Sequence, residues 1–202
     1  MPGQKATEAA RREQILKAAH EVALRRGIDG LTVRAVAARA RLSHGLVLFH
    51  FKRKDQLGLA LLDRVLATTL SLSIPEDIGA LSNPRERLQA LFRYELHRLS
   101  EQPRPIRLLL EYWARGVHNA VIRGKIGAEM DRYRAAFRNI AEEALRTEPG
   151  RWGKATPAGV AAAAVSLIIG YPVQAMMAPD QFDLEEYLSA VQGILGRLAL
   201  AA

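Results

Sequence analysis

Apolar residues recur along the chain at intervals of three and four, and no segment of useful length alternates apolar with polar residues. Such spacing places apolar side chains on one face of a helix, whereas a half-buried strand would alternate them. The segment 53–73 is the clearest example, with one apolar stripe formed by Leu57, Leu61, Leu62, Val65 and Leu66. The pattern predicts an all-α protein.

Prolines, glycines and capping residues divide this pattern into about nine helices. We expect them over residues 6–26, 32–40, 43–51, 53–73, 84–101, from 103 onward, 119–147, 157–178 and 184–199. Asn83 should cap the fifth helix, because Pro84 suits its first position, and Asp183 should cap the last. Loops are expected over residues 74–83 and after residue 147.

The positive charge is concentrated in the first third of the chain. Residues 1–66 hold 13 Lys and Arg against 6 Asp and Glu, whereas residues 67–202 hold 16 against 15. A basic segment of this kind favours binding to nucleic acid over an ordinary solvated helix surface. The chain has no cysteine, which excludes disulfides, zinc fingers and iron–sulfur sites and fits a reducing compartment, the cytoplasm.

Within this basic segment, the predicted helices 32–40 and 43–51 have the features of a helix-turn-helix. Val36 and Ala37 face inward on the first helix, Leu42 fills the turn, and Ser43 caps the second helix. A unit of this kind places its second helix in the major groove of DNA.

These residues resemble the TetR family of bacterial one-component repressors. The matched region covers about 50 of the 202 residues, and the residues that carry the resemblance are Arg12–Ala19, Gly27, Thr32, Val36, Ala37, Ala40, Leu42, Ser43, Gly45 and His50–Leu57. It implies a helix-turn-helix DNA-binding domain over residues 1–52. A helical ligand-binding and dimerisation domain would follow over residues 53–202, with the helix 53–73 linking the two.

By position, the resemblance also implies a set of residues that contact DNA: Thr32, Arg34, Ser43, His44, Gly45, Leu46, Phe49, His50 and Lys54. Thr32, His50 and Lys54 match positions that hold phosphates. His44 is the best candidate base reader, while Leu46 and Phe49 can pack on thymine methyls. Arg34, Arg39 and Arg41 fit DNA contact and an exposed helix face equally well.

The chain departs from the family pattern at several of these positions. Leu46 stands where Thr is common, and His50 stands where Tyr usually meets phosphate. Arg41 replaces the usual turn glycine, which costs on the order of 1 kcal/mol if its φ is positive.

The middle helices hold most of the aromatic and soft side chains, and in the similar family the ligand pocket lies among these helices. The candidate pocket residues are Phe92, Tyr94, His97, Leu109, Tyr112, Trp113, Met130, Tyr133, Phe137 and Gln174. Each of the apolar ones fits a core position as well as a ligand contact. The effector itself is unknown from the sequence.

The stretch 156–179 carries no charge and is long enough to cross a bilayer. Its Ala and Gly content and Pro172 favour a helix packed against protein, so no membrane partner is expected. With the helix 184–199 it predicts a four-helix interface between two copies, as in the family, with an intramolecular core as the alternative. The candidate interface residues are Val165, Ile168, Val173, Leu188, Val191 and Leu195.

Catalysis has little support, because the five histidines are scattered and no phosphate loop or nucleophile motif occurs. We expect no enzyme activity, no metal and no cofactor. The predicted function is a ligand-responsive transcriptional regulator, a repressor that binds a palindromic double-stranded DNA operator as a homodimer. The alternatives are a helical-bundle enzyme or small-molecule carrier with an incidental basic segment, and an architectural DNA binder without a ligand.

Overall fold

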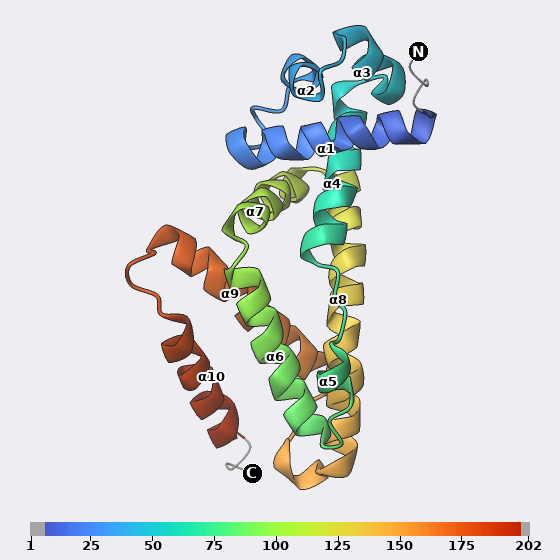
Figure 1. Cartoon of the computed structure of the whole chain (residues 1–202). Helices are drawn as coiled ribbons and strands as arrows, with labels where there is room; N and C mark the ends of the chain where they lie inside the picture. The colour runs from blue at the N-terminus through green and yellow to red at the C-terminus, as the bar shows by residue number, and fades with distance from the viewer. Residues whose placement is uncertain (1–6, 199–202) are drawn as a thin grey trace. The chain divides into compact units, whose positions relative to one another are not determined.

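The computed structural model describes residues 7–198, with side chains described as far as residue 193. Over that range the chain forms ten α-helices and one 3-10 helix, with no strand, which confirms the all-α prediction (Figure 1). The helices are α1 (Glu8–Arg26), α2 (Val33–Ala40), α3 (His44–Phe51), α4 (Lys54–Thr69), α5 (Glu76–Gly79), α6 (Pro84–Ser100), α7 (Pro103–His118), α8 (Ala120–Thr147), η1 (Pro149–Arg151), α9 (Pro157–Met177) and α10 (Leu184–Leu198).

Two of the sequence-based predictions about these elements are wrong. The predicted loop 74–83 contains α5, whose single turn is too short to produce a periodic apolar pattern. Its two acidic residues, Glu76 and Asp77, lie in the first turn, where they complement the helix dipole. The predicted helix 53–73 ends earlier, at Thr69, with the buried Leu70 as its C-cap.

The chain divides into two compact units. The first consists of the residues up to Leu70 together with Arg107–Gly127, and the second of Ser71–Ile106 together with the residues from Ala128 onward. The first unit therefore contains α1 to α4 and most of α7, and is larger than the domain 1–52 expected from sequence.

In the first unit, α1 packs against α2 and α4, and α3 packs against α2 and α4 (Figure 1). Ile15, Val36, Val47, Phe51 and Leu61 are essentially fully buried in its core. These residues come from four helices, so the three N-terminal helices and α4 share one core.

The helices α2 and α3 and the turn between them begin and end at residues that the sequence singles out. The hydroxyl of Thr32 accepts a hydrogen bond from Ala35 N, and that of Ser43 accepts one from Leu46 N, both at 3.1 Å. Arg41 ends α2 with a left-handed backbone, φ 55°. Arg41, which stands where the similar family usually has glycine, therefore adopts the positive φ that is expected to lower the stability of the fold.

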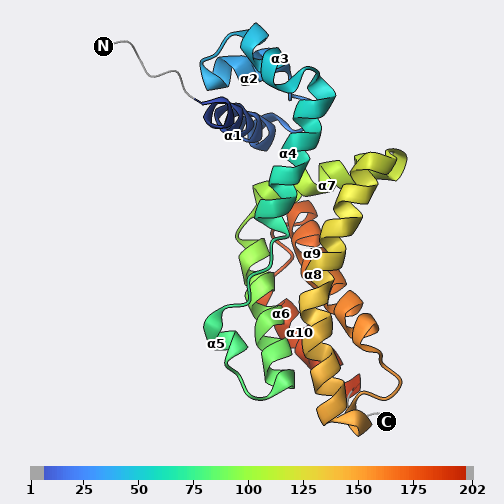
Figure 2. The ribbon, with the colours of Figure 1, turned by 90° about the vertical axis from the view of Figure 1, so that its right-hand side faces the viewer.

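In the second unit, α6 and α8 run alongside each other, and α9 and α10 pack against α6 (Figure 2). A buried polar cluster joins α6 to α8. The fully buried carboxylate of Glu95 accepts hydrogen bonds from Arg98 at 2.6 and 2.9 Å and from the Tyr133 hydroxyl at 2.7 Å. Burial, and then the Glu95 charge, raise the pKa of Tyr133, so its phenol stays protonated and donates.

Candidate DNA interface and ligand cavity

The helix α3 is buried on one face and exposed on the other. Val47 and Phe51 are buried, whereas Ser43, His44 and Gly45 are exposed and Phe49 is 73% exposed. A Cβ added at Gly45 would meet no atom within 4 Å, so the exposed face is also open to close approach.

The other candidate DNA residues lie on α3 itself and near the N-termini of α2 and α4 in the same unit. Thr32, Arg34 and Lys54 are exposed, and Leu46 and His50 are half-buried. Thr32 lies at the N-terminus of α2 and Lys54 at that of α4, where unpaired backbone N–H groups favour a phosphate.

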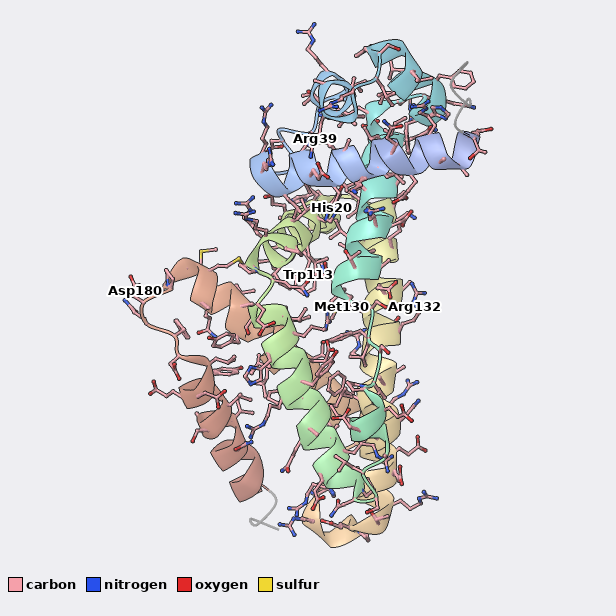
Figure 3. All side chains as sticks on the ribbon, in the orientation of Figure 1. His20, Arg39, Trp113, Met130, Arg132 and Asp180 are labelled. Carbon is pink, nitrogen blue, oxygen red and sulfur yellow. The ribbon has the colours of Figure 1, made fainter. Side chains whose placement is uncertain are left out.

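The three arginines left open by the sequence differ in their surroundings. Arg39 reaches from α2 toward α1 and forms an ion pair with Glu21 (Figure 3). Within the described residues, Arg34 and Arg41 form no ion pair and are exposed. Arg34 and Arg41 therefore remain available for a phosphate.

The position of α3 depends on side chains of α1 that sequence reasoning did not assign. Arg12 donates a hydrogen bond to the carbonyl of His50 at 3.1 Å and stacks its guanidinium 4.3 Å from the Phe51 ring centroid. Gln14 donates to the carbonyl of Ala40 at 2.9 Å, at the end of α2. Both residues lie in the segment that carries the family resemblance, which was the available signal for them.

The helix α7 holds the C-terminal end of α1. Arg107 donates to the carbonyl of Leu24 at 2.8 Å, and the Glu111 carboxylate accepts from Ile28 N at 2.6 Å. Gly27 has φ 69°, and a Cβ there would lie 2.9 Å from the Glu111 carboxylate, so the close approach needs a glycine.

The same helix also contacts the loop after α1 and the helix α4. Arg115 forms an ion pair with Asp29, and the Tyr112 hydroxyl donates to the carbonyl of Gly58 at 2.8 Å. These contacts, with those of Arg107 and Glu111, join α7 to the helices that carry the DNA-binding residues.

The second unit contains a cavity of about 280 Å³ between α6, α9, α10 and the turn that follows η1. Most of its lining is apolar or small, and the polar lining residues are Arg85, Gln89, Arg151, Trp152 and Gln192. Among the described lining residues none is acidic.

Of the ten residues predicted for a pocket, Phe92 lines this cavity. Leu109, Tyr112 and Trp113 lie on α7 in the first unit, Trp113 being half-buried (Figure 3). Tyr133 and Phe137 are in the core of the second unit, Met130 is half-buried on α8, and Tyr94 and Gln174 are exposed. His97 lies 3.4 Å from the carboxylate of Glu185.

Sequence reasoning did not name Arg85, Arg151 and Trp152, which line this cavity. Arg151 and Trp152 fall after residue 147, where a loop was expected. An aromatic residue outside any helical stripe, next to an arginine, was the signal that could have indicated Trp152.

The residues predicted for a dimer interface mostly face inward. Val165, Ile168, Leu188 and Val191 are buried within the chain itself, and Val173 is half-buried. The side chain of Leu195 lies outside the described residues. An interface formed by α9 and α10 would have to use their other faces.

Those other faces are largely uncovered. In the part of the chain that the structure describes, α9 is the one helix long and apolar enough to cross a membrane, with a third of that stretch buried. A single such helix is weak evidence for a membrane, because a helix packed in a soluble protein has the same composition. Met177, at its end, is 79% exposed.

Comparison with known proteins gives two matches to family sequence patterns. Residues 15–61 match bacterial regulatory proteins of the tetR family, and residues 84–200 match the C-terminal domain of the BetI-type transcriptional repressor. The chain is also 31% identical over 180 residues to an HTH-type transcriptional regulator in the dhlA 5' region of Xanthobacter autotrophicus, covering 86% of this chain and 84% of that protein.

Solved structures agree with the fold. A transcriptional regulator from Pseudomonas aeruginosa superposes with a TM-score of 0.79 at 21% identity, over 98% of this chain and 94% of that one. A regulator from Saccharomonospora viridis, solved in complex with choline, gives a TM-score of 0.75 at 18% identity, over 93% of this chain and 96% of that one.

Proposed function

The chain belongs to the TetR family of ligand-responsive bacterial transcriptional regulators, and we propose that it represses transcription in the cytoplasm by binding a palindromic operator as a homodimer. The observation that carries this proposal is the exposed face of α3. Ser43, His44, Gly45 and Phe49 lie open on a helix whose opposite face is buried, which is the arrangement of a recognition helix in a major groove.

In this proposal the residues around α3 divide into two groups. Thr32, His50 and Lys54 bind phosphates, which position the helix on any sequence. His44 and Phe49 contact base edges, His44 through a ring nitrogen and Phe49 through a thymine methyl, and so provide sequence preference.

A second copy of the chain is the proposed partner for α9 and α10. Two recognition helices are needed to read two half-sites about one helical turn apart. The outward face of α9 presents Ala162, Ser166 and Met177, which are exposed and uncharged. Small residues on that face let a partner helix approach closely, so four helices form the interface in place of the inward residues first expected.

The proposed response to an effector passes along the chain through α6 and α7. The helix α6 lines the cavity of the second unit, and α7 follows it after two residues. Since α7 is hydrogen-bonded to the end of α1, a shift of α6 on ligand binding would be passed to the DNA-binding helices. A ligand can produce this only by its differential affinity for the two states, typically 1–3 kcal/mol.

The test is DNA selection followed by affinity measurement. The purified chain should retain specific genomic fragments, and its affinity for them should fall steeply with salt because phosphate contacts release counterions. Phe49→Ala should weaken operator binding about tenfold or more while leaving binding to random DNA unchanged. Lys54→Ala should weaken both kinds of DNA and lower the salt slope by about one.

The matched control is Val117→Ala, which shortens another exposed apolar side chain, 67% exposed, on α7. It should bind the operator like the wild type. Retention of no genomic fragment, or equal operator affinity for Phe49→Ala and Val117→Ala, contradicts the proposed function.

A further inference from the structure

The cavity of the second unit combines an apolar wall with buried polar atoms. Leu88 and Phe92 of α6 and Val160 and Leu167 of α9 form much of the wall. Its volume, about 280 Å³, is at the small end of the range of ligand sites. At roughly 30 Å³ for each non-hydrogen atom, the value for liquid water, it holds about ten such atoms.

Two residues that line this cavity, Arg85 and Trp152, have a hydrogen-bond donor without an acceptor among the described residues. The Nε of Arg85 and the indole Nε1 of Trp152 are buried and unpaired, whereas the buried Nε of Arg151 faces the equally unpaired Oε2 of Glu148 at 3.7 Å. A buried donor left unpaired costs about 1–3 kcal/mol. Two such donors on residues that line one cavity favour an acceptor from outside the chain as their missing partner.

The charge around the cavity is positive. Arg85 forms no ion pair with any described residue, whereas Arg151 lies 3.7 Å from a carboxylate oxygen of Glu148, too far for a hydrogen bond. Glu148 therefore offsets the charge of Arg151 in part and leaves that of Arg85 uncompensated. A guanidinium with free N–H groups is matched by a carboxylate, which accepts two hydrogen bonds in its plane.

We propose, on the premise of the ligand-responsive function above, that this cavity binds a small amphipathic carboxylate. The carboxylate of the ligand accepts hydrogen bonds from Arg85 and Trp152, with Arg151 beside them. Its hydrocarbon part, an alkyl chain or an aromatic ring, packs against Leu88 and Phe92. Binding of such an anion removes the cost of the unpaired donors and neutralises the charge of Arg85.

The same lining disfavours a quaternary ammonium ligand such as choline. A ligand cation is held by the faces of several aromatic rings or by a carboxylate. This cavity instead places two guanidinium groups on its wall and no acidic lining residue among those described. A cation would meet charge of its own sign, so this chain is expected to differ from the choline-bound regulator that shares its fold.

The experiment is calorimetric titration of the full chain with octanoate, 3-phenylpropionate, 1-octanol and choline. At least one carboxylate should bind with a stoichiometry of one per chain, at least tenfold more tightly than 1-octanol, and choline should not bind. In a Trp113→Phe variant, the bound carboxylate should change the fluorescence of Trp152, the tryptophan at the cavity.

Arg85→Gln keeps a polar side chain and removes the charge, and it should weaken carboxylate binding at least tenfold. The matched control is Arg93→Gln, an exposed position on the same helix, which should bind like the wild type. Melting temperatures of both variants without ligand separate a loss of binding from a loss of folding. If Arg85→Gln does not fold, Trp152→Phe, which removes the indole N–H, should show the weakened binding instead.

Absence of carboxylate binding, equal binding of octanoate and 1-octanol, or equal affinity of Arg85→Gln and Arg93→Gln overturns the proposal. Each titration is paired with a measurement of operator binding. A chain that binds its operator but no carboxylate retains the proposed function and loses this inference, whereas a chain that retains no DNA loses the proposed function.

Discussion

His20 lies on α1 beside α4 with its ring Nε2 buried and without a hydrogen-bond partner in the described residues (Figure 3). Burial lowers the pKa of His20 below its ordinary value, the nearby Arg64 guanidinium lowers it further, and Glu21 acts weakly in the opposite direction. The folded chain therefore holds this imidazole neutral at a pH where the unfolded chain protonates it.

The first prediction follows from that difference in proton binding. Since the unfolded state binds more protons, the contribution of His20 to stability is present above the unfolded pKa, about 6.5, and is lost as the pH falls toward the folded value. The melting temperature should fall between pH 7.5 and pH 5.5, and His20→Gln should make that fall smaller. His118→Gln, at an exposed position, is the control and should leave the pH profile unchanged. Parallel profiles for His20→Gln and the wild type would contradict the prediction.

At the scale of elements, the helix α7 stabilises the turn at the C-terminal end of α1. Its Glu111 accepts the backbone N–H of Ile28 at 2.6 Å, just past the end of α1, and lies 3.8 Å from Arg107. The helix terminus leaves that N–H without another partner in the described chain, so the carboxylate completes the turn after α1.

Glu111→Ala should lower the free energy of unfolding by roughly 1–2 kcal/mol, because a hydrogen bond to a charged acceptor is lost and a part-buried donor is left unpaired. For a chain of this length the melting temperature should fall by about 2–8 °C. Glu142→Ala, at an exposed position on α8, is the control and should melt within about 1 °C of the wild type. A thermal melt followed by circular dichroism measures both. Equal melting temperatures for the two variants would show that α7 does not stabilise the end of α1.

For the whole molecule, the proposed homodimer depends on the outward face of α9. Ser166 is exposed near the middle of that helix, so a substitution there leaves the core of the chain intact. Ser166→Arg places an unpaired charge in the proposed interface, at a cost of several kcal/mol.

The expected result is a monomer by light scattering at micromolar concentration, with unchanged helical content and weakened operator binding. Ile74→Arg introduces the same charge at an exposed residue outside α9 and should leave a dimer. A wild-type monomer, or a Ser166→Arg variant that still dimerises, would show that a different surface or no surface joins two copies.

The sequence by itself determined the features that depend only on residues a few positions apart. The caps predicted at Ser43 and Asn83 form the hydrogen bonds expected of them, and the Asp183 side chain caps α10 by accepting from Glu186 N at 2.8 Å. A cap joins residues two or three positions apart, and helical periodicity repeats every three or four. Both can therefore be read without knowing how the helices pack, and the same local spacing carries the family resemblance.

Only the tertiary structure decided which apolar faces the chain buries and which residues meet at a site. The sequence correctly predicted that Ile168 and Leu188 lie on apolar faces of their helices, both of which are buried, but periodicity does not distinguish a face covered by the same chain from one covered by a partner. Glu111 and Ile28 are 83 positions apart in the sequence. Arg85 and Trp152 line the same cavity although they are also far apart in the sequence. Such contacts depend on the packing of whole helices, because no local pattern specifies which distant side chain a given face will meet.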